Sequence, residues 1–199
     1  MRARTTAVAG ALFLVAVANA GCSVSTTSDT TQTSDERPSD LLHDRRAATR
    51  ALAAVERRVG TTPARATEVL AYPEYLDIKV QDPAVPEHID EYEWRGGSVS
   101  GPEPVHLSGP QEEVEASLFP TSAVRWRDVP DIVREVEARA HHARPTRIEG
   151  AIGSYLIVRR STNPDDDGRV EIDLYLEGPR RSGYAELTAN GDLVTLHVS

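Results

Sequence analysis

The chain has little cysteine, lysine, phenylalanine or tryptophan. Its 199 residues include one cysteine, one lysine, two phenylalanines and two tryptophans. One cysteine excludes a disulfide within the chain. Because phenylalanine and tryptophan are scarce, a folded core must consist mainly of valine, leucine, isoleucine and alanine. The single lysine, Lys79, beside 21 arginines is typical of a GC-rich genome.

The chain also lacks an apolar run of the ~20 residues that a membrane-spanning helix needs. The run at residues 7–20 is shorter, follows a basic head and ends at the small residues Ala20 and Gly21, directly before Cys22. This pattern predicts a secretory signal peptide over residues 1–21.

A cysteine directly after such a cleavage site resembles the lipobox of bacterial lipoproteins, in which the mature chain begins at a lipid-modified cysteine. The family prefers leucine three residues before the cysteine, where this chain has Asn19. The resemblance implies that Cys22 is lipidated and holds the protein on the outer face of the plasma membrane, as in actinobacterial lipoproteins. The alternative is an ordinary secreted protein that is cut near Ala20 and keeps a free thiol.

Positive charge is scarce in the mature chain. Without residues 1–21, 31 acidic side chains face 20 basic ones, a formal charge of −11. Such a balance argues against a nucleic-acid partner, because phosphate neutralisation needs clustered lysine and arginine. It also argues against broad adhesion to anionic headgroups.

The mature chain divides into a tether and two similar folded units. Residues 22–40 are rich in serine, threonine and aspartate, and cannot bury enough surface to offset their ordering entropy, which predicts a disordered tether. Residues 41–107 begin with a helical stripe that Asp40 can cap and that ends at Gly60. Alternating strands follow, and Pro102 and Pro104 confine the last one to a sheet edge.

The same order of elements returns after a connector at residues 108–122. In residues 123–199, a helix starts near Pro130, and strands around Tyr155 and over 170–177 follow it. Asn190-Gly191 between two apolar runs predicts a hairpin with a two-residue type I′ turn. The fold class predicted is therefore α+β, with two tandem units of one helix plus a roughly four-stranded antiparallel sheet.

An offset of 80 or 81 residues aligns the halves at four places. These are Val55-Glu56 with Val136-Glu137, Tyr75-Leu76 with Tyr155-Leu156, Trp94 with Tyr175, and Gly97 with Gly178. The order of elements, together with the closing hairpin, resembles the tandem helix-plus-four-strand arrangement of PepSY-like domains and of the beta-lactamase inhibitor protein fold. This resemblance implies a sheet face that holds a partner protein, for instance a secreted hydrolase.

Two groups of side chains are candidate sites. Arg180 and Arg181 form a basic turn, and Tyr92, Trp94 and Tyr175 are candidates to line a protein-binding face beside it. The alternative is that these aromatics pack under the helices.

The acidic turn at 163–168 offers Asp165, Asp167 and Glu171 as a weak divalent-ion site. The bidentate glutamate of an EF-hand is absent, however, because Leu174 stands at position 12. We therefore expect a solvated turn, no resident metal and no cofactor.

The sequence thus predicts a lipid-anchored extracytoplasmic protein without catalytic activity. Its expected role is to bind another extracytoplasmic protein, with inhibition of that protein as one form of this role. The alternatives are a carrier of an apolar envelope lipid, which needs a large cavity, and an envelope hydrolase. The hydrolase has the least support, since no nucleophile motif is present.

Overall fold

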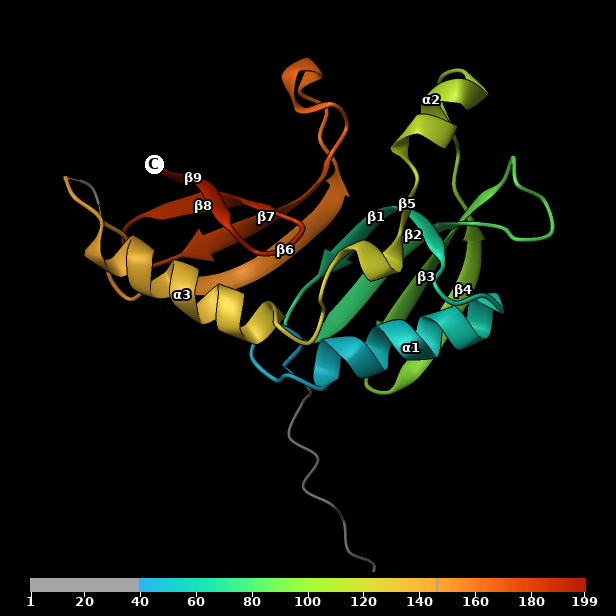
Figure 1. Cartoon of the computed structure of the whole chain (residues 1–199). Coiled ribbons are helices and arrows are strands. Elements are labelled where there is room, and N and C mark those ends of the chain that lie inside the picture. The colour runs from blue at the N-terminus through green and yellow to red at the C-terminus, as the bar shows by residue number, and fades with distance from the viewer. Residues whose placement is uncertain (1–39, 146) are drawn as a thin grey trace, which may run out of the picture. The chain divides into compact units, whose positions relative to one another are not determined.

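The structure, a computed structural model, describes residues 40–145 and 147–199 (Figure 1). Cys22, the predicted signal peptide 1–21 and the predicted tether up to residue 39 lie outside the described residues. In the described part of the chain, no helix combines the length and the apolar character needed to span a bilayer.

The first half of the fold is one helix followed by four strands. These are α1 (Ala47–Val59), β1 (Arg65–Ala71), β2 (Tyr75–Gln81), β3 (Ile89–Arg95) and β4 (Ser98–Pro104). The buried side of α1 is formed largely by small residues such as Ala48 and Ala51, so that the helix lies close to the sheet. Gly60 ends the helix in the left-handed conformation, as predicted.

The second half repeats this order after a short connector. The connector holds α2 (Gln111–Ser117), β5 (Phe119–Pro120) and the 3₁₀ turn η1 (Thr121–Ala123). The repeat consists of α3 (Val129–His142), β6 (Ile152–Arg160), the 3₁₀ turn η2 (Pro164–Asp166), β7 (Val170–Glu177), β8 (Ser182–Thr188) and β9 (Leu193–Val198). The predicted α+β class, with two tandem helix-plus-sheet units, is confirmed.

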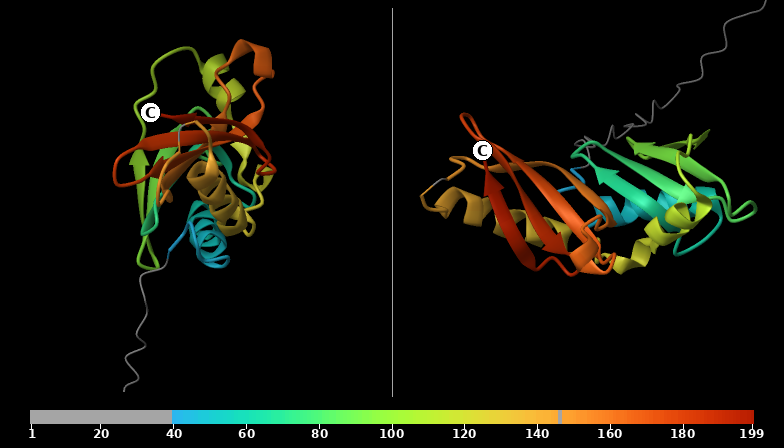
Figure 2. Two further views of the ribbon diagram at one scale, coloured as in Figure 1. Left: turned by 90° about the vertical axis from the view of Figure 1, so that its left-hand side faces the viewer. Right: turned by 90° about the horizontal axis from the view of Figure 1, so that it is seen from above.

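The eight long strands form one continuous antiparallel sheet in the order β4-β3-β2-β1-β6-β7-β8-β9, with β5 paired to β1. The two halves meet where β1 pairs with β6, with Val69 opposite Val158. Both helices lie on the same face of this sheet (Figure 2). Their buried residues join those of all the long strands except β4 and β9 in one apolar cluster. The opposite face is the open face of the sheet.

Two glutamates hold the helices to the sheet in the same way in each half. Glu56 Oε1 accepts from Ala64 N at 3.3 Å and from the Thr121 hydroxyl at 2.5 Å. Glu137 Oε1 accepts from Gly153 N at 2.8 Å and lies 3.0 Å from His43 Nε2. Each carboxylate therefore binds a backbone N–H at the start of the first strand of its half, and also a segment of the chain outside that unit's helix and sheet.

His43 joins the start of the described chain to α3. Its other ring nitrogen, Nδ1, lies 3.0 Å from Asp40 Oδ2. Burial alone would lower the pKa of His43, but the hydrogen bonds to Glu137 and Asp40 outweigh it and raise the pKa above the ordinary value of 6.5.

Three local predictions need correction. Asp40 does not cap α1: its carboxylate accepts from Leu42 N and His43 N and so closes a separate turn that buries Leu41 and Leu42. The turn at Asn190-Gly191 is not type I′, because only Gly191 has positive φ and the strands are four residues apart.

The third correction concerns the offset of 80 or 81 residues between the halves. It aligns Tyr75 of β2 with Tyr155 of β6, and Trp94 of β3 with Tyr175 of β7. These strands are not equivalent. The β6–β7 connection at 161–169 is longer than the β1–β2 connection at 72–74, so no constant offset aligns both helices and strands.

The two edges of the sheet differ in composition. β4 forms one edge and contains Pro102 and Pro104, which confirms the predicted edge position of the proline-bearing strand. β9 forms the other edge and contains no proline, and the side chain of Val194 is exposed there.

Candidate interaction surface

The most distinctive feature of the open face is a row of stacked rings that crosses the sheet. The row runs from Arg95 over Tyr75, Tyr72, Tyr155, Tyr175 and Tyr184 to His197, and we refer to these seven residues as the tyrosine row. It contains five of the six tyrosines in the chain. From β3 to β9 it crosses six strand spacings of ~4.8 Å, or roughly 30 Å.

Contacts between neighbours continue along the whole row. The ring centroids are 4.5 Å apart for Tyr75–Tyr72, 5.0 Å for Tyr72–Tyr155, 4.3 Å for Tyr155–Tyr175, 5.8 Å for Tyr175–Tyr184 and 4.6 Å for Tyr184–His197. The Arg95 guanidinium lies 4.1 Å from the Tyr75 centroid and closes one end by a cation–π contact.

Strand register produces the row. Tyr155, Tyr175, Tyr184 and His197 lie directly opposite one another on β6, β7, β8 and β9, and Tyr75 lies opposite Arg95. Directly opposed side chains on one face are close enough to interact. Because the two halves join through β1 and β6, the residues of both halves form one line.

The rings stand on the sheet with their faces turned to one another. Their interplanar angles lie between 13° and 28°. The ring faces are therefore largely covered by neighbouring rings, while the edges and hydroxyls remain at the surface. Flat stacking of a sugar ring on an exposed aromatic face is disfavoured by this arrangement.

Two hydroxyls of the row have a raised pKa. Burial, with Tyr72 beside it, raises the pKa of Tyr75 to about 12. Burial and the neighbouring Tyr175 and Tyr72 also raise the pKa of Tyr155. The hydroxyls of Tyr75 and Tyr155 therefore stay protonated at physiological pH, and each can both donate and accept a hydrogen bond.

An acidic groove lies beside the Arg95 end of the row. It is a cavity of about 300 Å³ lined by Asp77, Glu91, Glu93, Glu103, Ser100 and Gly101. Burial and the nearby Glu93 and Glu91 raise the pKa of Asp77, because a carboxylate there is repelled by its neighbours. The groove therefore has an excess of negative charge.

The cations closest to the groove already bind carboxylates. Lys79 Nζ lies 2.8 Å from Glu68 Oε1, and Arg95 Nε lies 3.1 Å from Glu93 Oε1. Further along the open face, Arg159 lies 2.9 Å from Asp173 and 3.7 Å from Glu171. Arg95 therefore balances Glu93, one of the four carboxylates of the groove, and the described ion pairs give the other three no partner.

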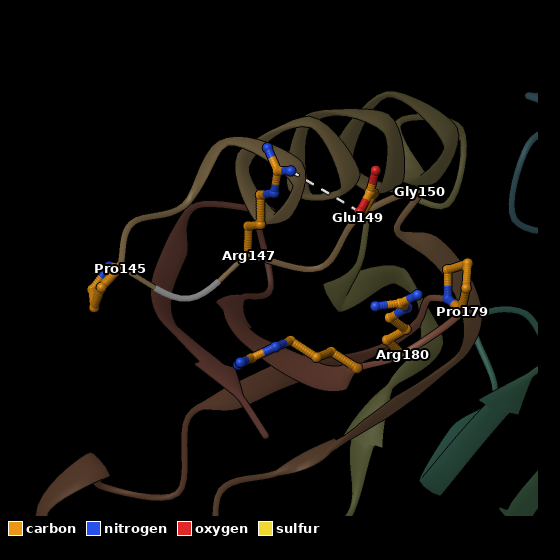
Figure 3. A pocket seen from close by; sticks show the side chains of 7 residues that line it. Pro145, Arg147, Glu149, Gly150, Pro179 and Arg180 are labelled. Carbon is orange, nitrogen blue, oxygen red and sulfur yellow. Dashed lines mark ion pairs between the residues drawn. The ribbon is translucent and has the colours of Figure 1, made fainter.

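The five residues predicted to form a binding face do not lie together in the structure. Tyr92 and Trp94 face the helices and are 7% and 5% exposed, so they belong to the core and not to a binding face. Tyr175 lies in the middle of the tyrosine row. Arg180 and Arg181 lie in the turn between β7 and β8 and line a different cavity, of about 390 Å³ (Figure 3).

The predicted weak metal site does not assemble. No group of three possible metal ligands comes together among the described residues. The Asp165 N–H donates to Asn163 in the turn. Glu171 lies on β7 near Arg159, and burial raises the pKa of its carboxyl group.

Sequence reasoning missed four tyrosines of the row, at positions 72, 75, 155 and 184. The available signal was that 75, 155, 175 and 184 each alternate with core-facing residues on a strand. That pattern places a tyrosine on the open face, but only the strand order brings the rings together.

No protein-family model, curated protein or solved structure matches this chain.

Proposed function

We propose that this protein is a protein-binding module, held at the outer face of the plasma membrane by a lipidated Cys22, whose binding surface is the open face of the sheet. The observation that carries the proposal is the tyrosine row, which presents five tyrosine side chains on one face. Tyrosine is enriched at the centres of protein interfaces. It offers a large amphipathic contact area at low conformational-entropy cost.

The stacked geometry supports a protein partner in particular. A row whose ring edges and hydroxyls are exposed suits backbone carbonyls and N–H groups of a partner loop or strand. Because each tyrosine ring lies between two neighbouring side chains, little side-chain freedom remains to be lost on binding. The surface is therefore preorganised.

The acidic groove defines the chemistry of the partner. Four carboxylates around one cavity attract a lysine- or arginine-bearing segment and repel an acidic one. We therefore expect a partner that places a basic loop beside Arg95 and an apolar or polar segment along the row.

The test compares three forms of the mature chain, exported from an actinobacterial host. The wild type, a Tyr155→Thr/Tyr175→Thr variant and a control, Arg57→Gln/Arg127→Gln, are purified and their bound proteins are quantified by mass spectrometry. A partner that is retained by the wild type and the control, and lost from the threonine variant, supports the proposal. A partner retained equally by all three forms contradicts the assignment of the surface.

Two further readouts complete the test. Glu91→Gln/Glu93→Gln should weaken partner binding mainly through the association rate, and added salt should reduce this difference. Native mass spectrometry addresses the lipid-carrier alternative: a lipid mass that leaves on denaturation, without any bound protein, would replace our proposal by that function.

A further inference from the structure

Three arginines gather around one cavity at the far end of the second half. The cavity of about 390 Å³ is lined by Pro145, Arg147, Glu149, Gly150, Pro179, Arg180 and Arg181. In Figure 3, Arg147 and Glu149 lie on one side of it and Pro179 and Arg180 on another. In a protein with an excess of acidic residues, such a concentration of guanidinium groups needs a physical account.

Two loops supply these arginines, and both are held in place. Ile148 is fully buried, and its N–H donates to Ala140 O at 3.0 Å, which fixes the loop between Arg147 and Glu149. The turn of the second loop is closed by Gly178 N donating to Arg181 O at 2.9 Å.

The loops touch each other at Gly178. A Cβ at this position would lie 2.7 Å from Glu149 O and 2.7 Å from Ile148 Cγ2, so only glycine permits the approach. The positions of the three arginine backbones are therefore set by the fold and do not depend on a ligand.

The described ion pairs leave these arginines largely unpaired. Arg147 NH2 lies 4.0 Å from Glu149 Oε2, a contact at the limit of an ion pair. No ion pair in the described residues involves Arg180 or Arg181, and both side chains are exposed. Three guanidinium groups and one carboxylate give the cavity a formal charge of +2.

We propose that this arginine cavity binds a phosphate oxyanion. The guanidinium group forms paired hydrogen bonds to phosphate oxygens, and a phosphate monoester carries a charge close to −2 at neutral pH. The cavity volume exceeds that of a lone phosphate and lies in the range of small-molecule sites, so there is room for a group attached to it. This site is separate from the tyrosine row and does not depend on the proposed protein partner.

The phosphate has two possible sources, a free phosphate compound or a phospholipid headgroup at the membrane. Calorimetric titration of the mature chain with inorganic pyrophosphate at low ionic strength tests the first source. Co-sedimentation with phosphatidylglycerol vesicles, compared with phosphatidylcholine vesicles, tests the second. Binding in either experiment supports the proposal and identifies the source, and binding in neither overturns it.

Variants separate a specific site from general charge attraction. Arg180→Gln/Arg181→Gln should weaken binding roughly tenfold or more, since hydrogen bonds between charged groups are lost. Arg57→Gln/Arg127→Gln removes the same charge from exposed positions elsewhere and should leave binding unchanged. Glu149→Gln should strengthen binding, because it removes the only carboxylate that lines the cavity.

Equal loss of binding in both double variants overturns the proposal, because it would show attraction to net charge alone. Thermal unfolding of each variant checks that the fold is intact, and the exposed positions of Arg180 and Arg181 make a folding defect a poor explanation of lost binding. Unchanged binding in Arg180→Gln/Arg181→Gln also overturns it.

Discussion

At the residue scale, Glu56 shows how much one buried carboxylate can contribute to the stability of the fold. It is 7% exposed and accepts hydrogen bonds from Ala64 N and the Thr121 hydroxyl. Glu56→Ala leaves both donors without an acceptor, and we expect a loss of about 2–3 kcal/mol in the free energy of unfolding. Glu56→Gln keeps an acceptor and should cost less.

Urea denaturation monitored by circular dichroism measures this effect. The control is Glu112→Ala on the exposed surface of α2, for which we expect a change within about 0.5 kcal/mol. A Glu56→Ala variant as stable as this control would show that the two donors find other partners.

His43 makes the stability of the fold depend on pH, and the direction of its pKa shift gives the sign of this dependence. Its pKa is raised in the folded state, so its contribution is fully present below its unfolded pKa near 6.5 and is lost as the pH rises through the higher folded pKa. The difference in unfolding free energy between the wild type and His43→Gln should therefore shrink as the pH rises above about 6.5. A difference that is constant with pH, or grows, contradicts the assigned contacts with Asp40 and Glu137.

At the scale of elements, the stacked rings should stabilise the pairing of the strands that carry them. Tyr175 contacts Tyr155 and Tyr184, and stacked aromatic pairs contribute roughly 0.5–1.5 kcal/mol each. Tyr175→Thr should thus lower the free energy of unfolding by about 1–3 kcal/mol, while Tyr175→Phe, which keeps both contacts, should change it little. Chemical denaturation of the two variants provides the comparison, and equal losses would mean that the hydroxyl, not the ring, is what matters.

The hairpin between β8 and β9 packs against α3 through a glycine. Gly191 has φ +90°, and a Cβ there would lie 2.3 Å from Ile132 Cδ1. Gly191→Ala combines backbone strain with this overlap, and we expect a cost of about 2–4 kcal/mol.

A double-mutant cycle separates the two causes. Ile132→Ala removes the overlapping atoms, so Gly191→Ala should cost less in the Ile132→Ala background than in the wild type. An equal cost in both backgrounds would assign the whole effect to the backbone conformation.

The sequence predicted the individual helices and strands better than it predicted how they are arranged. The alternating pattern after the first helix correctly predicted strands, and Pro102 and Pro104 correctly predicted an edge strand. The tyrosine row could not be predicted in this way, since it depends on register between strands up to about 100 residues apart. Tyr92 and Trp94 follow the alternative stated for them, packing under the helices. The sequence left both positions open, because alternation shows two faces of a strand but does not show which of them the helices cover.

At the scale of the whole molecule, the pairing of β1 with β6 makes two similar units into one sheet. Because the apolar core is also continuous across this joint, we expect a single cooperative unfolding transition. Tryptophan fluorescence reports Trp94 and Trp126, which lie before α3, whereas near-ultraviolet circular dichroism also reports the tyrosines of the second half. The two urea transitions should coincide.

Val158→Asn tests the joint directly. Val158 is fully buried on β6 opposite Val69 of β1. The side-chain amide of an asparagine at this position would be buried among apolar side chains, which destabilises the fold. Both signals should shift together to lower urea concentrations. A shift confined to one signal would show that the two halves unfold independently.

The unequal edges of the sheet limit how this protein can associate with copies of itself. Pro102 and Pro104 lack the N–H groups that an added strand would need, so β4 terminates the sheet. β9 has no such block and leaves one edge able to pair. A molecule with a single pairing edge can join one other molecule through its strands. The resulting pair has β4 at both outer edges, so no further molecule can be added. Association by strand pairing therefore stops at a dimer and cannot produce an open fibre.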